Sequence, residues 1–200
     1  MQIDYLKIFE TMPYDFRLQE HILSHFLQLN QKYRTLIKAN CDISEEDIKL
    51  KLLMTGSKFY ESFANNPIAL YKKILSGYKN NNIAIIKRGA KTDLTITYPH
   101  EIYKSGIGME GIMNINELSE RECLKIETKT RKGINIKTLS RKKKAVWKLN
   151  IIIDRNLDKE YFIKTIFPGK MAPPFPDKEF QNDREYHISS EFWDNHIFLI

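Results

Sequence analysis

Cysteine, glycine and proline are scarce in this chain. Its 200 residues include two cysteines, Cys41 and Cys123, which lie far apart and form no CxxC pair. That spacing predicts neither a disulfide framework nor a zinc ribbon. Eight glycines and seven prolines argue against internal repeats and long linkers.

Long apolar runs are also missing. No stretch approaches the ~18 residues that a membrane-spanning helix needs. The opening residues, MQIDYLKIFETMPYDF, lack the charged start and apolar run of a signal peptide. We therefore expect a soluble cytoplasmic protein without a membrane partner. Hydrophobic residues make up 42% of the chain and aromatic residues 12%, which is typical of a folded globular protein.

Motifs for nucleotides and metals are weak or incomplete. Residues 106–111 spell GxGxxG, but they follow no Rossmann-type strand and open no helix, so we do not predict nucleotide binding there. His21 and His25 are four residues apart and share a helix face, yet the intervening Ile-Leu-Ser lacks the Glu of HExxH. We interpret both as solvated or satisfied histidines, and we predict neither a metal nor a cofactor.

What the chain has in excess is positive charge within one segment, residues 124–164. This segment carries thirteen Lys and Arg against four acidic residues, a formal charge of +9, whereas the whole chain is +7. A basic segment attached to a nearly neutral body favours a polyanion partner such as RNA. The alternative is a protein whose lysines are merely solvated.

The spacing of apolar residues changes near residue 80. Before it they recur at steps of three and four, as in Ile22, Phe26 and Leu29, which predicts helices over 1–80. Residues 81–200 read as a sheet region, and the two regions are expected to form one compact unit. A closing helix is expected over 183–198. Strands are expected at 83–86, 94–98, 124–131, 134–139, 145–154 and 161–167.

Most connections between these strands are too short for helical crossovers, so we expect antiparallel pairing. The predicted fold is α+β: N-terminal helices packed on a mainly antiparallel sheet of four or more strands, with a C-terminal helix. If the apolar side of this meander faces the core, its outer face presents cations for a phosphate backbone. The candidate nucleic-acid-binding residues are Lys125, Lys129, Lys137, Arg141, Lys142, Lys143, Lys144 and Lys148.

Such a face also fits RNA cleavage without metal. The 2′-hydroxyl attacks the adjacent phosphate, so the protein supplies a base, an acid and cations for the developing charge. His100 is the only histidine of the sheet region before the closing segment, and Thr165 can position a phosphate oxygen. The candidate catalytic residues are His100, Arg131, Arg155, Lys164 and Thr165.

The run Tyr161–Gly169, YFIKTIFPG, resembles the last core strand of the barnase–EndoU–colicin–RelE superfamily of small ribonucleases, which often ends in Lys-Thr-apolar-aromatic-Pro. The resemblance spans roughly residues 98–169. It implies N-terminal helices on a four-stranded antiparallel sheet and metal-independent RNA cleavage by a bacterial or phage toxin. It places Lys164 and Thr165 in the active site and matches His100 loosely to an upstream histidine. The sheet segment lacks a second histidine, so the sequence does not identify the general base.

We therefore predict a toxin-type endoribonuclease with RNA as substrate and an acidic antitoxin or immunity protein as a possible partner. One alternative is a non-catalytic RNA- or DNA-binding protein that uses the same basic face. Another is a protein-interaction module of immunity or antitoxin type. The sequence does not indicate the oligomeric state.

Overall fold

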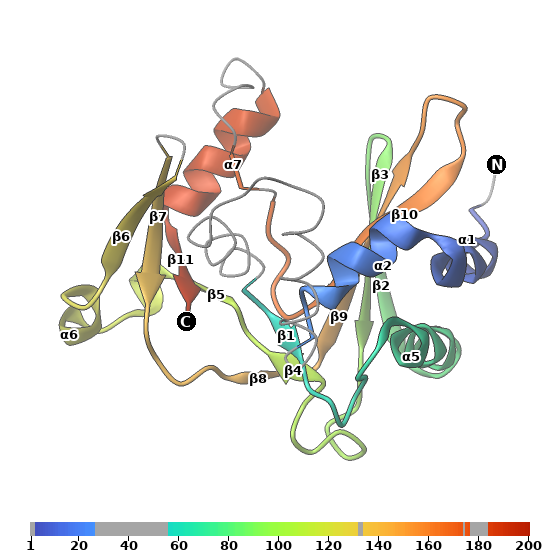
Figure 1. Ribbon diagram of the computed structural model, residues 1–200, viewed down its shortest axis with the longest axis horizontal. Helices are drawn as coiled ribbons and strands as arrows, with labels where there is room; N and C mark the ends of the chain where they lie inside the picture. Colours follow the sequence, from blue (N-terminus) through green and yellow to red (C-terminus); the bar gives the residue numbers. More distant parts are fainter. Residues whose placement is uncertain (1–2, 27–55, 132–133, 174, 177–183) are drawn as a thin grey trace.

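A computed structural model of the chain describes residues 3–26, 56–131, 134–173, 175–176 and 184–200. Three sheets organise these residues, and the ribbon has two lobes joined by extended segments (Figure 1). The first lobe contains the N-terminal helices and one four-stranded sheet. The second lobe contains the other four-stranded sheet and helix α7 (Arg184–Asp194).

The sheet of the first lobe has the order β10-β9-β3-β2, and every neighbouring pair is antiparallel. Its inner face is buried because apolar residues alternate along the strands, as Leu149, Ile151 and Ile153 do on β9. The expected strands are therefore confirmed at this sheet. Its strands are β2 (Asn82–Arg88), β3 (Lys91–Thr97), β9 (Lys148–Arg155) and β10 (Tyr161–Pro168).

Three helices cover that inner face: α1 (Tyr5–Thr11), α2 (Phe16–Leu23) and α5 (Pro67–Asn80). Each begins after a side-chain cap, in which Asp4, Asp15 or Asn66 accepts a hydrogen bond from a backbone N–H of the first turn. Residues 27–55 lie outside the described part of the chain, and with them the expected continuation of the α2 helix beyond Phe26. A single turn, η1 (Met12–Tyr14), links α1 to α2.

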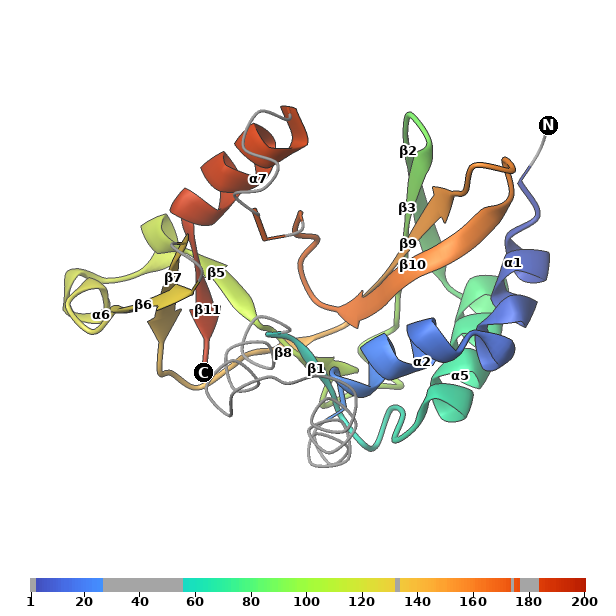
Figure 2. The same ribbon diagram turned by 45° about the horizontal axis from the view of Figure 1, so that its top comes forward.

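A small middle sheet connects the two lobes. It pairs β1 (Lys58–Phe59), β4 (Gly108–Met109) and β8 (Ala145–Val146) in the order β1-β4-β8. The pairing is antiparallel and sets Lys58 opposite Met109, which in turn lies opposite Ala145. Figure 2 shows this sheet close to the end of α2 and of β10.

The second lobe is a mixed sheet of order β5-β11-β7-β6. Strand β11 pairs antiparallel with β5 and parallel with β7, and aromatic residues of α7 pack against it. Two short helical turns, η2 (Ile115–Glu117) and α6 (Glu120–Cys123), precede the β6–β7 hairpin. The strands are β5 (Ile112–Asn114), β6 (Glu127–Arg131), β7 (Ile134–Leu139) and β11 (His196–Leu199).

The α+β fold class is confirmed, but three details of the prediction are wrong. Residues 58–59, which lie in the region expected to be helical, form strand β1 because they pair with β4. The basic segment does not form one meander, because β6 and β7 belong to the second lobe whereas β9 and β10 belong to the first. The expected helix over 183–198 ends at Asp194, and the apolar residues after it form β11 because they pair with β5 and β7. Among the described residues, no helix is long and apolar enough to cross a membrane.

Candidate active site

The structure does not bring the five predicted catalytic residues together. Arg131 ends β6 in the second lobe, whereas Arg155, Lys164 and Thr165 lie on β9 and β10 of the first lobe. His100 follows β3, where its ring stacks on Trp147 with centroids 4.0 Å apart. Trp147 directly precedes β9 and Arg155 is its last residue, so His100 and Arg155 lie at opposite ends of this strand, about 25 Å apart along its length.

Arg155 and Lys164 are engaged with neighbours at the β9–β10 hairpin. Lys164 Nζ lies 3.1 Å from a carboxylate oxygen of Asp154. Burial raises the pKa of Asp154, but hydrogen bonds from the backbone N–H of Arg155 and from Lys164 hold it below its ordinary value. The guanidinium of Arg155 lies over the ring of Tyr161, and its Nε donates to the carbonyl of Lys159. Both cations are therefore held by this hairpin.

Thr165 has a different neighbour, which the sequence did not indicate. Its Oγ1 lies 2.8 Å from Nε2 of His21, on helix α2. The pairing of β10 with β9 shifts register between Ile163 and Thr165, so Lys164 is the extra residue of a β-bulge. Bulges redirect the side chains next to them, and here Thr165 meets the helix that runs beside the edge of β10 (Figure 2).

His25 lies one helical turn beyond His21, with ring centroids 5.5 Å apart. It is buried, its Nδ1 lies 2.9 Å from the carbonyl oxygen of Ser57, and its ring stacks on Phe167. Because that carbonyl only accepts, Nδ1 carries the proton. Burial lowers the pKa of His25 well below its ordinary value, and the charge that His21 or Lys58 carries when protonated lowers it further. His25 is therefore neutral at physiological pH.

Lys58 is the third member of this group. Its side chain is buried, 7% exposed overall, and Nζ donates to the carbonyl of Ser24 at the end of α2. Burial lowers the pKa of Lys58 to about 7, and the charge of Lys143 contributes to the same shift. A lysine with this pKa holds a transferable proton near neutrality. We call His21, His25, Lys58 and Thr165 the histidine–lysine cluster.

Glycines of the GxGxxG run make room for Lys58. A Cβ added at Gly108 would collide with the carbonyl of Lys58, and one at Gly111 would collide with the backbone nitrogen of Ser57. The glycine run therefore packs against the segment that carries Lys58. Strand β4, which lies within the run, pairs with β1, which contains Lys58. We did not expect a phosphate loop there, and the structure gives these glycines a packing role.

The predicted nucleic-acid-binding residues are distributed over both lobes. Lys125, Lys129 and Lys137 belong to the second lobe, and Lys148 begins β9 in the first. The run between β7 and β8 is not simply solvated: Arg141 pairs with Glu122 at 3.1 Å, and Lys143 is half-buried near enough to Lys58 to affect its pKa. Lys142 and Lys144 are exposed. The predicted cations therefore do not form one sheet face.

Sequence reasoning missed the contact between His21 and Thr165. The signal was the pair His21 and His25 on one helix face, which we read as satisfied or solvated histidines. Both histidines do have hydrogen-bond partners, but the partner of His21 comes from a strand 144 residues away and was not predicted. Within the described residues, no three His, Cys, Asp or Glu side chains are grouped as a metal site would require.

No protein-family model matches the chain, and no curated protein matches it. A solved structure to which it is similar is a conserved hypothetical protein from Toxoplasma gondii ME49. The TM-score is 0.48 at 8% sequence identity, and the match covers 70% of this chain and 88% of that one. Neither finding names an activity, so the candidate site is defined by its own side chains.

Proposed function

We propose that the chain is a metal-independent endoribonuclease and that the histidine–lysine cluster is its reaction centre. The observation that carries the proposal is the 2.8 Å contact between His21 Nε2 and Thr165 Oγ1. It joins a histidine, the side chain that most often serves as a general base, to the threonine that the ribonuclease-like motif places in an active site. Both side chains are half-buried, so a substrate atom can approach them.

The proposed reaction starts with a proton transfer to His21. The unprotonated Nε2 takes the proton of the 2′-hydroxyl, and the 2′-oxygen then forms a bond to the adjacent phosphorus. Thr165 Oγ–H donates to a non-bridging phosphate oxygen, which gains negative charge as the bond forms. A substrate hydroxyl therefore replaces Thr165 as the hydrogen-bond partner of His21.

Lys58 is the proposed acid. The bond between phosphorus and the 5′-oxygen breaks as that oxygen receives the proton of Lys58, which leaves a 2′,3′-cyclic phosphate and a 5′-hydroxyl. A pKa of about 7 makes Lys58 a far better donor than an ordinary lysine, because about half of it is protonated near neutral pH. Neutral His25, whose ring centroid lies 5.5 Å from that of His21, adds no charge beside the base.

The test is incubation of the purified chain with total RNA in EDTA, followed by analysis of the new ends. We expect cleavage with cyclic phosphate ends, loss of cleavage in His21→Ala, and full cleavage in His187→Ala, which removes an exposed histidine of α7. Salt-sensitive RNA binding without turnover would instead favour the non-catalytic nucleic-acid-binding protein. No affinity at moderate salt would favour the protein-interaction module.

The toxin role is a separate part of the proposal. A ribonuclease that acts on cellular RNA needs a neutralising partner, and an acidic protein suits the excess of cations in residues 124–164. Expression in a bacterial host is the cheap test. Growth arrest with the natural chain but not with His21→Ala supports the toxin role, and normal growth with an active, purified enzyme contradicts it.

A further inference from the structure

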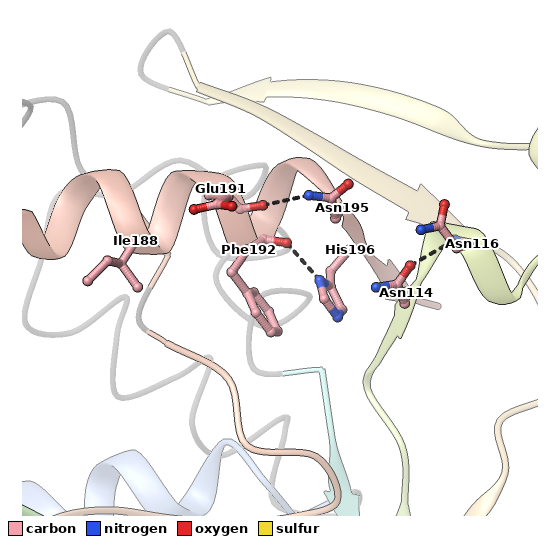
Figure 3. Close-up of a pocket in the computed structure, with 7 residues that line it drawn as sticks. All are labelled: Asn114, Asn116, Ile188, Glu191, Phe192, Asn195 and His196. Atoms are coloured by element: carbon pink, nitrogen blue, oxygen red, sulfur yellow. Dashed lines mark hydrogen bonds between the residues drawn. The ribbon is translucent and has the colours of Figure 1, made fainter. Parts of the chain in front are cut away.

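The second lobe carries an open depression of about 450 Å³ between the end of α7 and the β5–β11 pair (Figure 3). Its lining includes Asn114, Phe192, Asn195 and His196, with Ile188 and Glu191 on the exposed helix side. A volume of this size accommodates a group as large as a nucleobase. The lining has one carboxylate and no lysine or arginine, which disfavours a phosphate in the depression itself.

The hydrogen-bonding roles of two facing side chains are fixed by their other partners. His196 Nδ1 lies 2.7 Å from the carbonyl oxygen of Phe192, so Nδ1 carries the proton and Nε2 is left as an acceptor. Asn114 Oδ1 accepts from the backbone N–H of Asn116 at 2.8 Å, so its amide nitrogen remains as a donor. His196 and Asn114 are direct cross-strand partners, which places the acceptor and the donor side by side.

A neighbouring donor and acceptor match the complementary pair on the Watson–Crick edge of an unpaired nucleobase. The same depression offers apolar surface beside these polar groups, because Phe192 and exposed Ile188 belong to its lining and the ring of Phe192 holds that of His196 in place by stacking, with centroids 3.8 Å apart. Proteins hold single bases by packing against the flat face of the base and by hydrogen bonds to its edge.

We propose that this depression binds one unpaired base of a single-stranded nucleic acid. The proposal rests on the proposed function for its substrate class and adds a subsite remote from the histidine–lysine cluster. Lys137 supplies the cation for the attached phosphate, since its Nζ donates at 2.7 Å to the carbonyl of Asp194, which directly precedes Asn195 of the lining. A peptide amide and a sugar are poorer candidates, because neither has a flat aromatic face for the apolar lining or a phosphate for Lys137.

The test is titration of the His21→Ala protein with each of the four nucleoside 5′-monophosphates, observed by NMR at the His196 imidazole and the Asn114 amide. At least one nucleotide should shift both signals, whereas ribose 5-phosphate, glucose and N-acetylglycine amide should shift neither. His196→Phe keeps the ring stack and removes the acceptor, and it should weaken binding about tenfold. His187→Phe, on the same helix outside the depression, should bind as the parent does.

Equal shifts with ribose 5-phosphate, glucose or the peptide amide would overturn the proposal, and so would the absence of a shift with all four nucleotides. Because base binding and RNA cleavage are measured separately, the two hypotheses can fail separately. Base binding by a natural chain that never cleaves RNA contradicts only the proposed function. Cleavage of RNA without base binding at His196 contradicts only the subsite.

Discussion

Nε2 of His21 and Oγ1 of Thr165 lie 2.8 Å apart, although 144 residues separate them in the chain. One comes from the second helix and the other from the bulged edge strand of the first-lobe sheet. The contact gives Thr165 a titratable partner that neither Lys164 nor His100 provides. It also moves the candidate reaction centre from the open face of the sheet to the junction of α2, β1 and β10.

The hydroxyl of Thr165 should matter more for catalysis than for stability. Thr165→Val keeps the shape and removes the hydrogen bond, so we expect cleavage to fall about 10²-fold. The free energy of unfolding should fall by only about 1 kcal/mol. Thr165→Ser keeps the hydroxyl and should retain most activity. Single-turnover cleavage and urea unfolding measure both effects, and equal activity of the Val and Ser variants would contradict the role of the hydroxyl.

The alkaline limb of the pH–rate profile should follow the deprotonation of Lys58. An acid must be protonated, so kcat/KM should decline as the pH rises through about 7, the pKa of Lys58. The charge of Lys143 contributes to that low pKa, and Lys143→Gln should therefore move the limb to higher pH. Lys142→Gln removes an exposed neighbour of the same type and should leave the limb in place. If the alkaline limb lay at the same pH in the natural chain, Lys143→Gln and Lys142→Gln, Lys58 would be excluded as the acid.

Lys58 should also make stability depend on pH. Its pKa is about 7 when folded and 10.5 ordinarily, so between these values the unfolded chain binds more protons. The free energy of unfolding therefore rises with pH across this window and is lowest, for this group, below pH 7. Lys58→Met removes the penalty of the buried charge and should be more stable at neutral pH, by about 1–3 kcal/mol.

Urea unfolding at several pH values between 6 and 9.5, a range set by the folded and ordinary pKa of Lys58, measures the difference between the two proteins. The upper limit avoids the tyrosines, because burial raises the pKa of Tyr98 and of Tyr5 and adds a slope of opposite sign at higher pH. A constant difference between Lys58→Met and the natural chain would show that Lys58 has an ordinary pKa.

Local patterns predicted the elements of the first lobe because each depends on neighbours in the sequence. Pro67 indicated the start of α5, and the alternation in 145–154 indicated β9. The division of the basic segment into two sheets was not predictable in this way. Alternation shows that a strand has a buried face, but it does not show which sheet buries it.

The candidate site was predicted only in part for the same reason. The motif pointed to Thr165, yet no local pattern links it to His21 or places Lys58 beside His25. The strand β11 was read as helix because a short apolar run after a helix fits both structures, and pairing with β5 and β7 decides between them.

Gly111 should be among the least replaceable residues outside the cluster. A Cβ there collides with the backbone of Gly56 and Ser57, so Gly111→Ala forces apart the segment that carries Lys58. We expect a loss of about 3 kcal/mol or more in the free energy of unfolding. Gly89→Ala is the control: nothing lies within 4 Å of its added Cβ, and only its positive φ of 61° is strained. That strain should cost about 1 kcal/mol, and thermal unfolding ranks the two variants.

Cations of the second lobe should affect substrate binding and not the chemical step. Lys129 is exposed on β6, in the sheet that does not contain Thr165. Lys129→Gln should raise KM and reduce the dependence of log KM on log salt by about one phosphate contact, with kcat unchanged. Thr165→Val should instead lower kcat and leave the dependence of log KM on log salt unchanged. Steady-state cleavage of one oligoribonucleotide at several salt concentrations separates the two patterns. A loss of kcat in Lys129→Gln would mean that the basic strand β6 reaches the reaction centre after all.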